Sequence, residues 1–465
     1  MKRIYPIMLA LFAVMALLAA APEDREKGKG GKGANGQGAG AGGQVEPAVI
    51  PAYLYNVWLC RPSATSVTVS VIAWEDLEVA IDYGQIANQL DQRSRAFQVN
   101  AGQSQEIDLS ELESDAETFY RLSYRRRGDT AVMQDVVRSF HTQRAPGSAF
   151  TFTLQADSHL DVSTDVRVYQ QTLANMLADK PDFMIDLGDT TMVDKFGSFY
   201  TRSESQFKAQ RYYMGRIAHS VPMFMVLGNH DGERGDRADM ANWSQGMRQK
   251  YFPNPTDGND KNSYYAFEWG NALFVVLDPF WASNKRDDDN WGATLGEVQY
   301  RWLANTLQSS KAAFKFVFIH HLVGGLGKDV RGGVTTAPYM EWGGKNADRS
   351  DGFAQHRPGW EMPIHQLFVK NGVSAVFHGH DHLFVKEELD GIIYQEVPQP
   401  GHPSGGTRGA EEYGYTGTIL GSSGHLRVTV GPAEAKVEYV KSIVPGVTKG
   451  DFENGAVAQS YVLKK

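Results

Sequence analysis

The sequence predicts an α/β protein in which two packed sheets lie between outer layers of helices, preceded by a small all-β sandwich. Two observations predict this class. From Tyr53 to Gln143, apolar residues alternate with polar ones and show no helical period, as in half-buried strands. From Phe150 onward, short apolar runs alternate with helical segments, and a β-rich tail follows Gly391. This order is typical of mixed sheets with helices outside them.

Length and charge restrict the function. The chain has 465 residues, which is too long for one typical core and favours two domains. The formal net charge is -8 and there is no long basic run, which argues against a nucleic-acid footprint but allows a small anionic substrate. The only cysteine, Cys60, excludes an intrachain disulfide and is expected to be a small core residue.

Residues 1–21 have the three parts of a secretory signal peptide. Lys2 and Arg3 supply positive charge, Ile7–Leu18 forms the apolar core, and Ala19-Ala20-Ala21 supplies a small-residue cleavage site. A transmembrane anchor is the alternative, but the apolar run is short for a span of about 20 residues. We therefore expect export to the periplasm or the extracellular space, with no membrane span after cleavage.

Two domains are expected after the signal peptide. Residues 22–47 are rich in Gly and predict a flexible linker. Residues 48–144 form the β-sandwich, and residues 146–465 form the α/β domain. In the sandwich, Arg125-Arg126-Arg127 is either a docking patch or, as we prefer, a solvated strand end.

The α/β domain is predicted in order along the chain. Five buried strands are expected at Phe150–Leu154, Phe183–Leu187, Met223–Leu227, Phe314–Ile319 and Ser374–Phe377. Helices are expected from a cap at Ser163 or Thr164 to about Ala178, over Ser205–His219, from a Thr294/Glu297 capping box to Ser309, and from Pro363 to Asn371-Gly372. A hairpin turns at Gly270-Asn271, and the tail strands are Ile392–Val397, Leu426–Val430 and Lys436–Val440.

One long segment, residues 324–360, is rich in Gly, Trp and charge and has little periodicity. A loop of this length is usually either functional or disordered, and we interpret this one as facing the substrate. Arg331, Lys345 and Arg357 lie within it. They are either contacts for a second anionic group of the substrate or solvated surface cations.

Metal-ligand residue types follow each of the five strands. Because the carboxyl ends of strands in open α/β sheets build the sites of such proteins, these side chains are expected to converge. Aspartate, asparagine and histidine suit a pair of borderline-hard divalent cations, and no thiolate is involved. The segments are Asp157-Ser158-His159, Gly188-Asp189, Gly228-Asn229-His230-Asp231, His320-His321 and Phe377-His378-Gly379-His380-Asp381-His382.

The spacing within these segments supports a dinuclear metal hydrolase. Asp157 and His159 are alternate residues and can face one point, as can His380 and His382. A carboxylate directly after Gly188 sits where the chain can bend, so Asp189 can bridge two cations. Each signal alone is weak, since a single His is more often structural. Five such segments in order make a purely structural interpretation improbable.

These segments resemble the motifs of the calcineurin-like metallophosphoesterase superfamily in order and spacing. The preceding sandwich is similar to the fibronectin-type-III-like (immunoglobulin-like) domain of purple acid phosphatases. The resemblance implies a four-layer α-β-β-α sandwich and a phosphoric ester hydrolase with two metal ions, which would be Mn, Zn or Fe. It covers nearly everything after the linker and says little about the substrate.

The resemblance also implies a role for each residue. One metal would be held by Asp157, His159, Asp189 and His382, and the other by Asp189, Asn229, His320 and His380. His230 would lie beside the phosphate as a leaving-group acid or a stabiliser of charge. Asp231 or Asp194 would orient it, His321 would lie behind the ligands or near the phosphate, and His378 would be structural.

The sequence departs from the superfamily at Met192. Purple acid phosphatases place an iron-binding Tyr at this position, three residues beyond the bridging Asp, so we expect that this protein is not purple. Several protein phosphatases of the superfamily have an Asp there, which supports the catalytic His. The segment after His321 also lacks the usual Pro.

The resulting prediction is an exported dinuclear-metal phosphoesterase that hydrolyses small-molecule phosphate esters by attack of a metal-activated hydroxide. A phosphodiesterase rather than a phosphomonoesterase is one alternative. A non-catalytic binding protein on the same scaffold is another, disfavoured because all seven ligand positions are occupied. The natural substrate, the metal identities, the pH optimum and the oligomeric state stay open.

Overall fold

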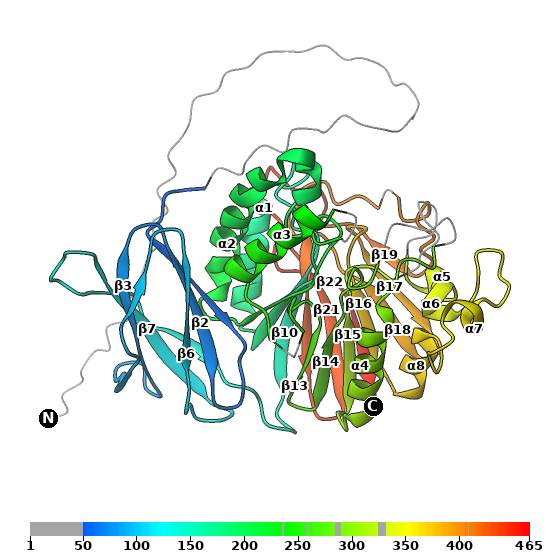
Figure 1. Ribbon diagram of the computed structural model, residues 1–465, viewed down its shortest axis with the longest axis horizontal. Helices are drawn as coiled ribbons and strands as arrows, with labels where there is room; N and C mark the ends of the chain where they lie inside the picture. Colours follow the sequence, from blue (N-terminus) through cyan, green and yellow to red (C-terminus); the bar gives the residue numbers. More distant parts are fainter. Residues whose placement is uncertain (1–49, 235–236, 257–258, 284–289, 324–331, 408) are drawn as a thin grey trace, which may run out of the picture. The chain divides into compact units, whose positions relative to one another are not determined.

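The computed structural model describes residues 50–234, 237–256, 259–283, 290–323, 332–407 and 409–465 (Figure 1). The predicted signal peptide and the whole of the predicted linker lie outside these residues. No helix in this part of the chain is long and apolar enough to cross a bilayer.

Residues 55–141 form two antiparallel sheets that pack face to face as a small β-sandwich. The apolar side chains of the two sheets share one core, which includes Val69, Ile81 and Leu122. One sheet has the order β1-β2-β6, and the other has β4-β3-β7-β8 with β5 paired to β3 and β9 to β7. The bounds are β1 Tyr55–Cys60, β2 Val67–Ala73, β3 Leu77–Gly84, β4 Gln92–Arg93, β5 Phe97–Val99, β6 Ser104–Leu109, β7 Glu117–Arg126, β8 Met133–Gln134 and β9 Arg138–His141.

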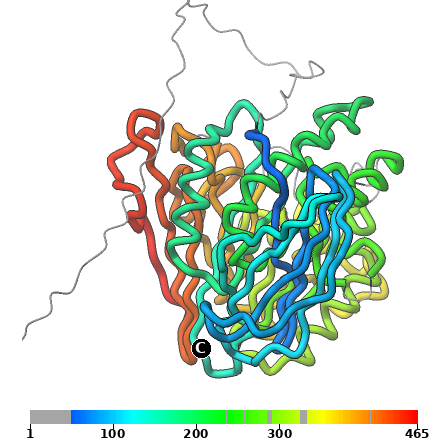
Figure 2. The backbone as a smooth tube through the Cα atoms, turned by 90° about the vertical axis from the view of Figure 1, so that its left-hand side faces the viewer, coloured from blue at the N-terminus to red at the C-terminus, as the bar shows by residue number. Residues whose placement is uncertain are grey.

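Strand β2 is buried along its whole length because both of its faces are covered. Val69 and Val71 point into the sandwich core, whereas Ile72 packs with Trp58 and Cys60 against helical residues of the next domain. Figure 2, turned by 90°, shows these strands in blue and cyan. Cys60 is a buried core thiol, as expected.

The three consecutive arginines at and just beyond the end of strand β7 all form ion pairs. Arg125 lies 2.6 Å from Glu78, Arg126 lies 2.6 Å from Glu75, and Arg127 lies 3.4 Å from Asp76. Each charge is matched on the sandwich itself, which agrees with a solvated strand end rather than with a docking patch.

The α/β domain contains two mixed sheets. The first has the order β12-β11-β10-β20-β21-β22, and the second has β13-β14-β15-β16-β18-β17-β19. Strands β10, β11 and β12 are parallel, as are β14, β15, β16 and β18. The bounds are β10 Phe150–Gln155, β11 Phe183–Asp186, β12 Met223–Met225, β13 Tyr265–Trp269, β14 Ala272–Val276, β15 Phe314–Phe318, β16 Ala375–His378, β17 Phe384–Leu389, β18 Ile392–Glu396, β19 Thr418–Leu420, β20 Gly424–Val430, β21 Glu434–Lys441 and β22 Val457–Lys464.

Alternation along the strands separates the layers. In β11, Phe183 and Ile185 face the core between the two sheets, whereas Met184 faces the helices. Strands buried on both faces read as continuous apolar runs. The predicted four-layer arrangement is therefore confirmed (Figure 1). Helices α1 Val166–Ala178, α2 Glu204–Ala218 and α3 Ala238–Tyr251 cover the first sheet, and α4 Gly296–Ser309, α5 Gly333–Thr336, α6 Met340–Gly343, α7 Phe353–His356 and α8 Ile364–Lys370 belong to the second half.

Helix ends differ from the prediction in two places. Helix α1 is capped by Asp165, whose side chain accepts a hydrogen bond from the backbone N–H of Arg167. Ser163 bonds to Asp161 instead. Thr294 accepts from the N–H of Gly296, but Glu297 pairs with Arg301 on the surface of α4. The sequence alone does not distinguish Asp165 from Ser163 or Thr164 as the cap of α1, because Ser, Thr and Asp are all good caps.

Candidate dinuclear metal centre

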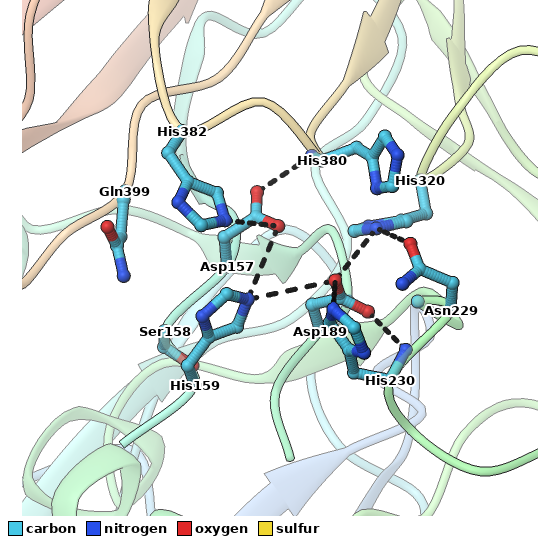
Figure 3. A network of polar contacts seen from close by, with 12 residues as sticks. Asp157, Ser158, His159, Asp189, Asn229, His230, His320, His380, His382 and Gln399 are labelled. Carbon is cyan, nitrogen blue, oxygen red and sulfur yellow. Dashed lines mark hydrogen bonds and ion pairs between the residues drawn. The ribbon is translucent and has the colours of Figure 1, made fainter. Parts of the chain in front are cut away.

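The predicted ligands come together at the carboxyl ends of β10, β11, β12, β15 and β16. Figure 3 shows all seven around one region, although the first and last are more than two hundred residues apart. Six of the seven, all but Asn229, form two groups, within each of which the ligand atoms lie within 4.8 Å of one another. One group is Asp157, His159 and His382, and the other is Asp189, His320 and His380.

Asp189 faces both groups with one oxygen. Its Oδ2 atom lies 3.3 Å from Nε2 of His320 and 3.7 Å from Nε2 of His159. Its Oδ1 atom accepts a hydrogen bond from the backbone N–H of His230 at 2.7 Å. A carboxylate held in this way is placed to bridge two cations, as the bridging assignment requires.

The second group is oriented from behind by the backbone. Nδ1 of His320 lies 2.8 Å from the carbonyl oxygen of Leu187, so this nitrogen donates its proton there. Nε2 then faces Asp189 and Asn229, whose Oδ1 lies 3.2 Å away, and it is the nitrogen that a metal ion would take. Fixing one nitrogen of a ligand histidine determines which nitrogen is free for a metal.

In the first group, a buried carboxylate oxygen lacks a hydrogen bond. Oδ2 of Asp157 accepts from the N–H of His380 at 2.8 Å, whereas Oδ1 has no hydrogen-bond partner among the described residues. Oδ1 lies 3.6 Å from Nε2 of His382 and 3.8 Å from Nε2 of His159. Because buried polar atoms are normally partnered, this arrangement fits a cation between the three side chains.

The ligand backbone is strained. Asp157, His159, Asp189, His380 and His382 all have left-handed φ values, between 43° and 90°. Such conformations cost non-glycine residues on the order of 1–3 kcal/mol each and persist where the surroundings enforce them. Asp, Asn and His tolerate this region better than most residues. Five of the seven predicted ligands therefore have a left-handed backbone conformation.

Two glycines allow this close packing. Gly188 has φ of 91°, and a Cβ atom there would lie 2.4 Å from the backbone nitrogen of Gly228. A Cβ atom on Gly379 would lie 2.8 Å from Oδ2 of Asp157. Both positions require the absence of a side chain, in line with the predicted bend after β11 and the predicted close approach after β16.

Buried carboxylates and histidines shift each other's pKa in this pocket. Burial lowers the pKa of His159, but contacts with Asp161 and Asp189 outweigh it and raise the pKa to about 10. Burial likewise opposes the charge on His320, whose pKa rises to about 9 beside Asp189. Burial raises the pKa of Asp157 to about 7. Without metal ions, these side chains thus retain protons, and bound cations would take over the neutralisation of the same carboxylates.

His230 is oriented by Asp194. Its Nδ1 atom lies 2.9 and 3.0 Å from the two carboxylate oxygens of Asp194, and its Nε2 atom lies 3.8 Å from Oδ2 of Asp189. Asp231 instead accepts hydrogen bonds from the backbone N–H groups of Asp189, Gly228 and Thr191. Of the two predicted carboxylates, the structure therefore assigns the contact with His230 to Asp194 and gives Asp231 a structural position.

His321 lies beside the second group. Its ring centroid is 5.1 Å from that of His380 and 5.3 Å from that of Phe280. Burial, aided by the neighbouring His320, lowers the pKa of His321 to about 3, so the ring is neutral. The guanidinium of Arg234 lies over Phe280 at 5.9 Å.

Residues 332–360 of the long segment are described, and the expectation that the whole segment faces the substrate stays a prediction. Arg357 donates to Glu341 and to the carbonyl oxygen of Trp291, so its charge is used within the fold and not for a substrate. The side chain of Lys345 is exposed. Arg331 lies outside the described residues. Helices α5, α6 and α7 occupy the rest of the segment, where the sequence predicted a loop.

Three residues at the site were not predicted. Asp161 lies 3.6 Å from Nδ1 of His159. Its position two residues after His159 in the chain could have suggested this contact. Arg234 follows the His230 segment, but its position over Phe280 has no signal in the sequence. The side-chain amide of Gln210, in helix α2, donates to the Ser158 hydroxyl at 2.9 Å.

Met192 is buried and donates its N–H to Gln206. The expectation that the protein is not purple stays a prediction.

Comparison with known proteins agrees with this geometry. The family described as calcineurin-like phosphoesterase matches residues 150–384. No curated protein sequence matches the chain. A solved structure of PhoD is similar with a TM-score of 0.64 at 15% identity, over 88% of this chain and 90% of that chain. The purple acid phosphatase PPD1 from yellow lupin (Lupinus luteus) seeds is similar with a TM-score of 0.60 at 16% identity, over 88% of this chain and 74% of that chain.

At these identities the two solved structures establish the fold. The activity follows from the family match, which spans every predicted ligand from Asp157 to His382. Family membership implies a dinuclear metal site, and the unpartnered oxygen of Asp157 with the two groups of carboxylate and imidazole ligands fits that requirement. The chain belongs to the calcineurin-like phosphoesterase family and is a phosphoric ester hydrolase.

Proposed function

We propose that this protein hydrolyses small phosphate esters at two metal ions that share Asp189. The single observation that supports this most strongly is the position of Asp189 Oδ2, which lies 3.3 Å from His320 and 3.7 Å from His159. One group would comprise Asp157, His159, His382 and Asp189, and the other Asn229, His320, His380 and Asp189. Oxygen and imidazole donors without thiolate suit Mn, Zn or Fe.

Metal ions bound there supply an activated water and neutralise charge on phosphoryl oxygens. The protein supplies orientation and proton transfer. His230 is partly exposed at the site, and Asp194 fixes its ring with Nε2 turned toward Asp189. From this place His230 donates to the departing oxygen of the ester, or to a phosphoryl oxygen whose charge grows in the transition state.

The substrate side of the site is bounded by His321 and Phe280. The neutral ring of His321 lies between Phe280, which it meets edge-on, and the tilted ring of His380, so it shields the second group without adding positive charge. Arg234 is the cation next to these rings, and we assign to it the contact with a remaining anionic oxygen of the substrate. This assignment takes the place of the one predicted for Arg357.

The experiment is a hydrolysis assay on matched panels of phosphomonoesters and phosphodiesters. Activity should be lost on treatment with a chelator and restored by Mn²⁺ or Zn²⁺. Asp189→Ala should lose activity together with at least one metal ion, measured by elemental analysis. Asp82→Asn, which changes a buried carboxylate of the β-sandwich, is the control and should retain activity and the full metal content. No turnover by the fully metallated protein on either panel would contradict the proposed function and favour a non-catalytic binding protein.

We also propose that the protein is exported to the periplasm or the extracellular space. The support is the sequence of residues 1–21, with Lys2 and Arg3 before an apolar core and Ala19-Ala20-Ala21 after it. Sequencing the N-terminus of the protein recovered from a bacterial periplasm or medium should show a start after Ala21. Retention in the cytoplasm with Met1 in place would refute export.

A further inference from the structure

The segment Gly379–His382 carries one ligand of each metal group. His380 belongs with Asp189 and His320, and His382 belongs with Asp157 and His159. Both histidines have left-handed backbone conformations, with φ of 90° and 64°. A conformation of this kind in two residues on either side of Asp381 needs contacts that enforce it. The structure shows such contacts on the side of the segment that faces away from the ligands.

Asp381 attaches the segment to a buried polar cluster. Its backbone N–H donates to Oε1 of Glu396 at 2.9 Å, and its Oδ2 accepts from the hydroxyl of Tyr415 at 2.9 Å. The same hydroxyl lies 3.2 Å from Oε2 of Glu396. Nδ1 of His378 lies 2.5 Å from that oxygen. All four side chains are buried, so water does not compete for these bonds.

Tyr415 is itself held on the opposite side. The next residue, Thr416, donates both its N–H and its hydroxyl to Oε1 of Glu387, at 2.8 and 2.9 Å. Oε2 of Glu387 accepts from the N–H of Val334 at 3.0 Å. The chain next to Tyr415 is therefore attached to strand β17 and helix α5, and the Tyr415 hydroxyl contacts Asp381 from this attached position.

The cluster places the carboxyl groups of Asp381 and Glu396 and the imidazole of His378 around one tyrosine hydroxyl. Burial, reinforced by Asp381, raises the pKa of Glu396 well above its usual range. A protonated Glu396 allows the two carboxyl groups to lie close together around one hydroxyl. The cluster acts as a set of hydrogen bonds and not as a charged surface.

We propose that Tyr415 is a positioning residue for both metal ions, acting through Asp381 on His380 and His382. This inference rests on the proposed function, since it concerns the same metal site. Because the segment supplies a ligand to each group, a less firmly held segment lowers the affinity of the protein for both ions together. Outer hydrogen-bond partners of metal ligands commonly change metal affinity by about 10- to 100-fold.

The test compares Tyr415→Phe with a matched control. Tyr300→Phe removes another buried hydroxyl, which donates to the carbonyl oxygen of Met362 at 2.8 Å on the outer helix α4. Titration of the metal-free proteins with Mn²⁺ should show an affinity about tenfold weaker or more for Tyr415→Phe at both ions, and wild-type affinity for Tyr300→Phe. At saturating Mn²⁺, kcat of Tyr415→Phe should return to near the wild-type value. Thermal unfolding of the metal-free variants measures their general loss of stability separately.

Wild-type Mn²⁺ affinity in Tyr415→Phe would overturn the inference, as would an equal loss of affinity in Tyr300→Phe. Should Tyr415→Phe fail to fold, Asp381→Ala removes the same hydrogen bond from the other partner and must show the same loss at both ions. The proposed function is judged separately by the wild-type protein. A wild-type protein that binds two ions and turns over, beside a Tyr415→Phe variant of unchanged affinity, defeats this inference alone.

Discussion

Nδ1 of His230 lies 2.9 Å from a carboxylate oxygen of Asp194, although the two residues are 36 positions apart. The adjacent carboxylate of Asp231 is turned away and bonds to backbone N–H groups of the segment that follows β11. The partner of the candidate catalytic histidine is therefore supplied by a stretch of 3₁₀ helix, Val193–Ser203.

This contact predicts a graded loss of activity. His230→Ala should lower kcat by about 10²- to 10⁴-fold, as expected for loss of a general acid, and Asp194→Ala should lower it by a smaller factor because the ring remains but is no longer oriented. The effect should be larger for alkyl phosphates than for p-nitrophenyl phosphate, whose leaving group needs no proton.

Lys195→Ala is the matched control for Asp194→Ala, since Lys195 lies beside the same carboxylate at 3.8 Å on the solvent side. It should leave kcat near the wild-type value. Equal losses for alkyl and p-nitrophenyl esters in His230→Ala would show that His230 does not assist the leaving group.

Gly379→Ala should disrupt the metal site through its backbone. The new Cβ atom would lie 2.7 Å from Cβ of Ala156 and 2.8 Å from Oδ2 of Asp157, and overpacking of this kind costs about 1–3 kcal/mol. We expect a lower free energy of unfolding and a weaker affinity for the ion at Asp157.

Gly246→Ala is the opposite case, because nothing lies within 4 Å of its Cβ position in helix α3. It should stabilise the protein by about 0.5–1 kcal/mol, since Ala is a better helix former than Gly. Urea unfolding with metal titration compares the two variants. Gly379→Ala with wild-type stability and metal content would contradict the close packing described above.

Metal binding should release protons at neutral pH. Without cations, the pKa of His159 is about 10 and that of His320 about 9, so both rings are protonated at pH about 7 and must lose a proton to bind a metal. Affinity for Mn²⁺ should therefore rise with pH up to about 10. Calorimetry in two buffers of different ionisation enthalpy measures the release directly, and a value of zero would refute it.

The same shifts predict the stability of the metal-free protein. A histidine whose pKa is raised by folding stabilises the folded state below its unfolded pKa, and this contribution is lost as pH rises through the folded value. The metal-free protein should lose stability as the pH rises from about 7 to 10, whereas the metal-loaded protein should not. Urea unfolding of both forms across this range checks the sign.

The strands, and the convergence of the candidate ligand side chains at their ends, were predictable because local pattern determines them. Residues such as Phe183 and Met184 in β11 form an unbroken apolar run since both faces are covered, and Asp189 follows where the chain turns. Helix α3 and strand β22 were not predicted. Strand β22 alternates weakly, and its residues are largely exposed or half-buried at the edge of the sheet. Weak amphipathic pattern leaves such elements without a signal.

Contacts between distant segments could not be predicted from the sequence. Asp231 is next to His230 in the chain, but the direction of its side chain depends on the N–H groups of residues 189 and 191. Asp194 reaches His230 only through the turn after β11. Tyr415 lies in a segment without periodicity, and its contact with Asp381 exists only once β17 and β18 are in place.

Anomalous X-ray diffraction from crystals loaded with Mn²⁺ or Zn²⁺ tests the central claim most directly. The account predicts two neighbouring peaks, one enclosed by Asp157, His159 and His382 and the other by Asn229, His320 and His380, with Asp189 between them. A single peak, or peaks away from these side chains in a protein that hydrolyses phosphate esters, would contradict it.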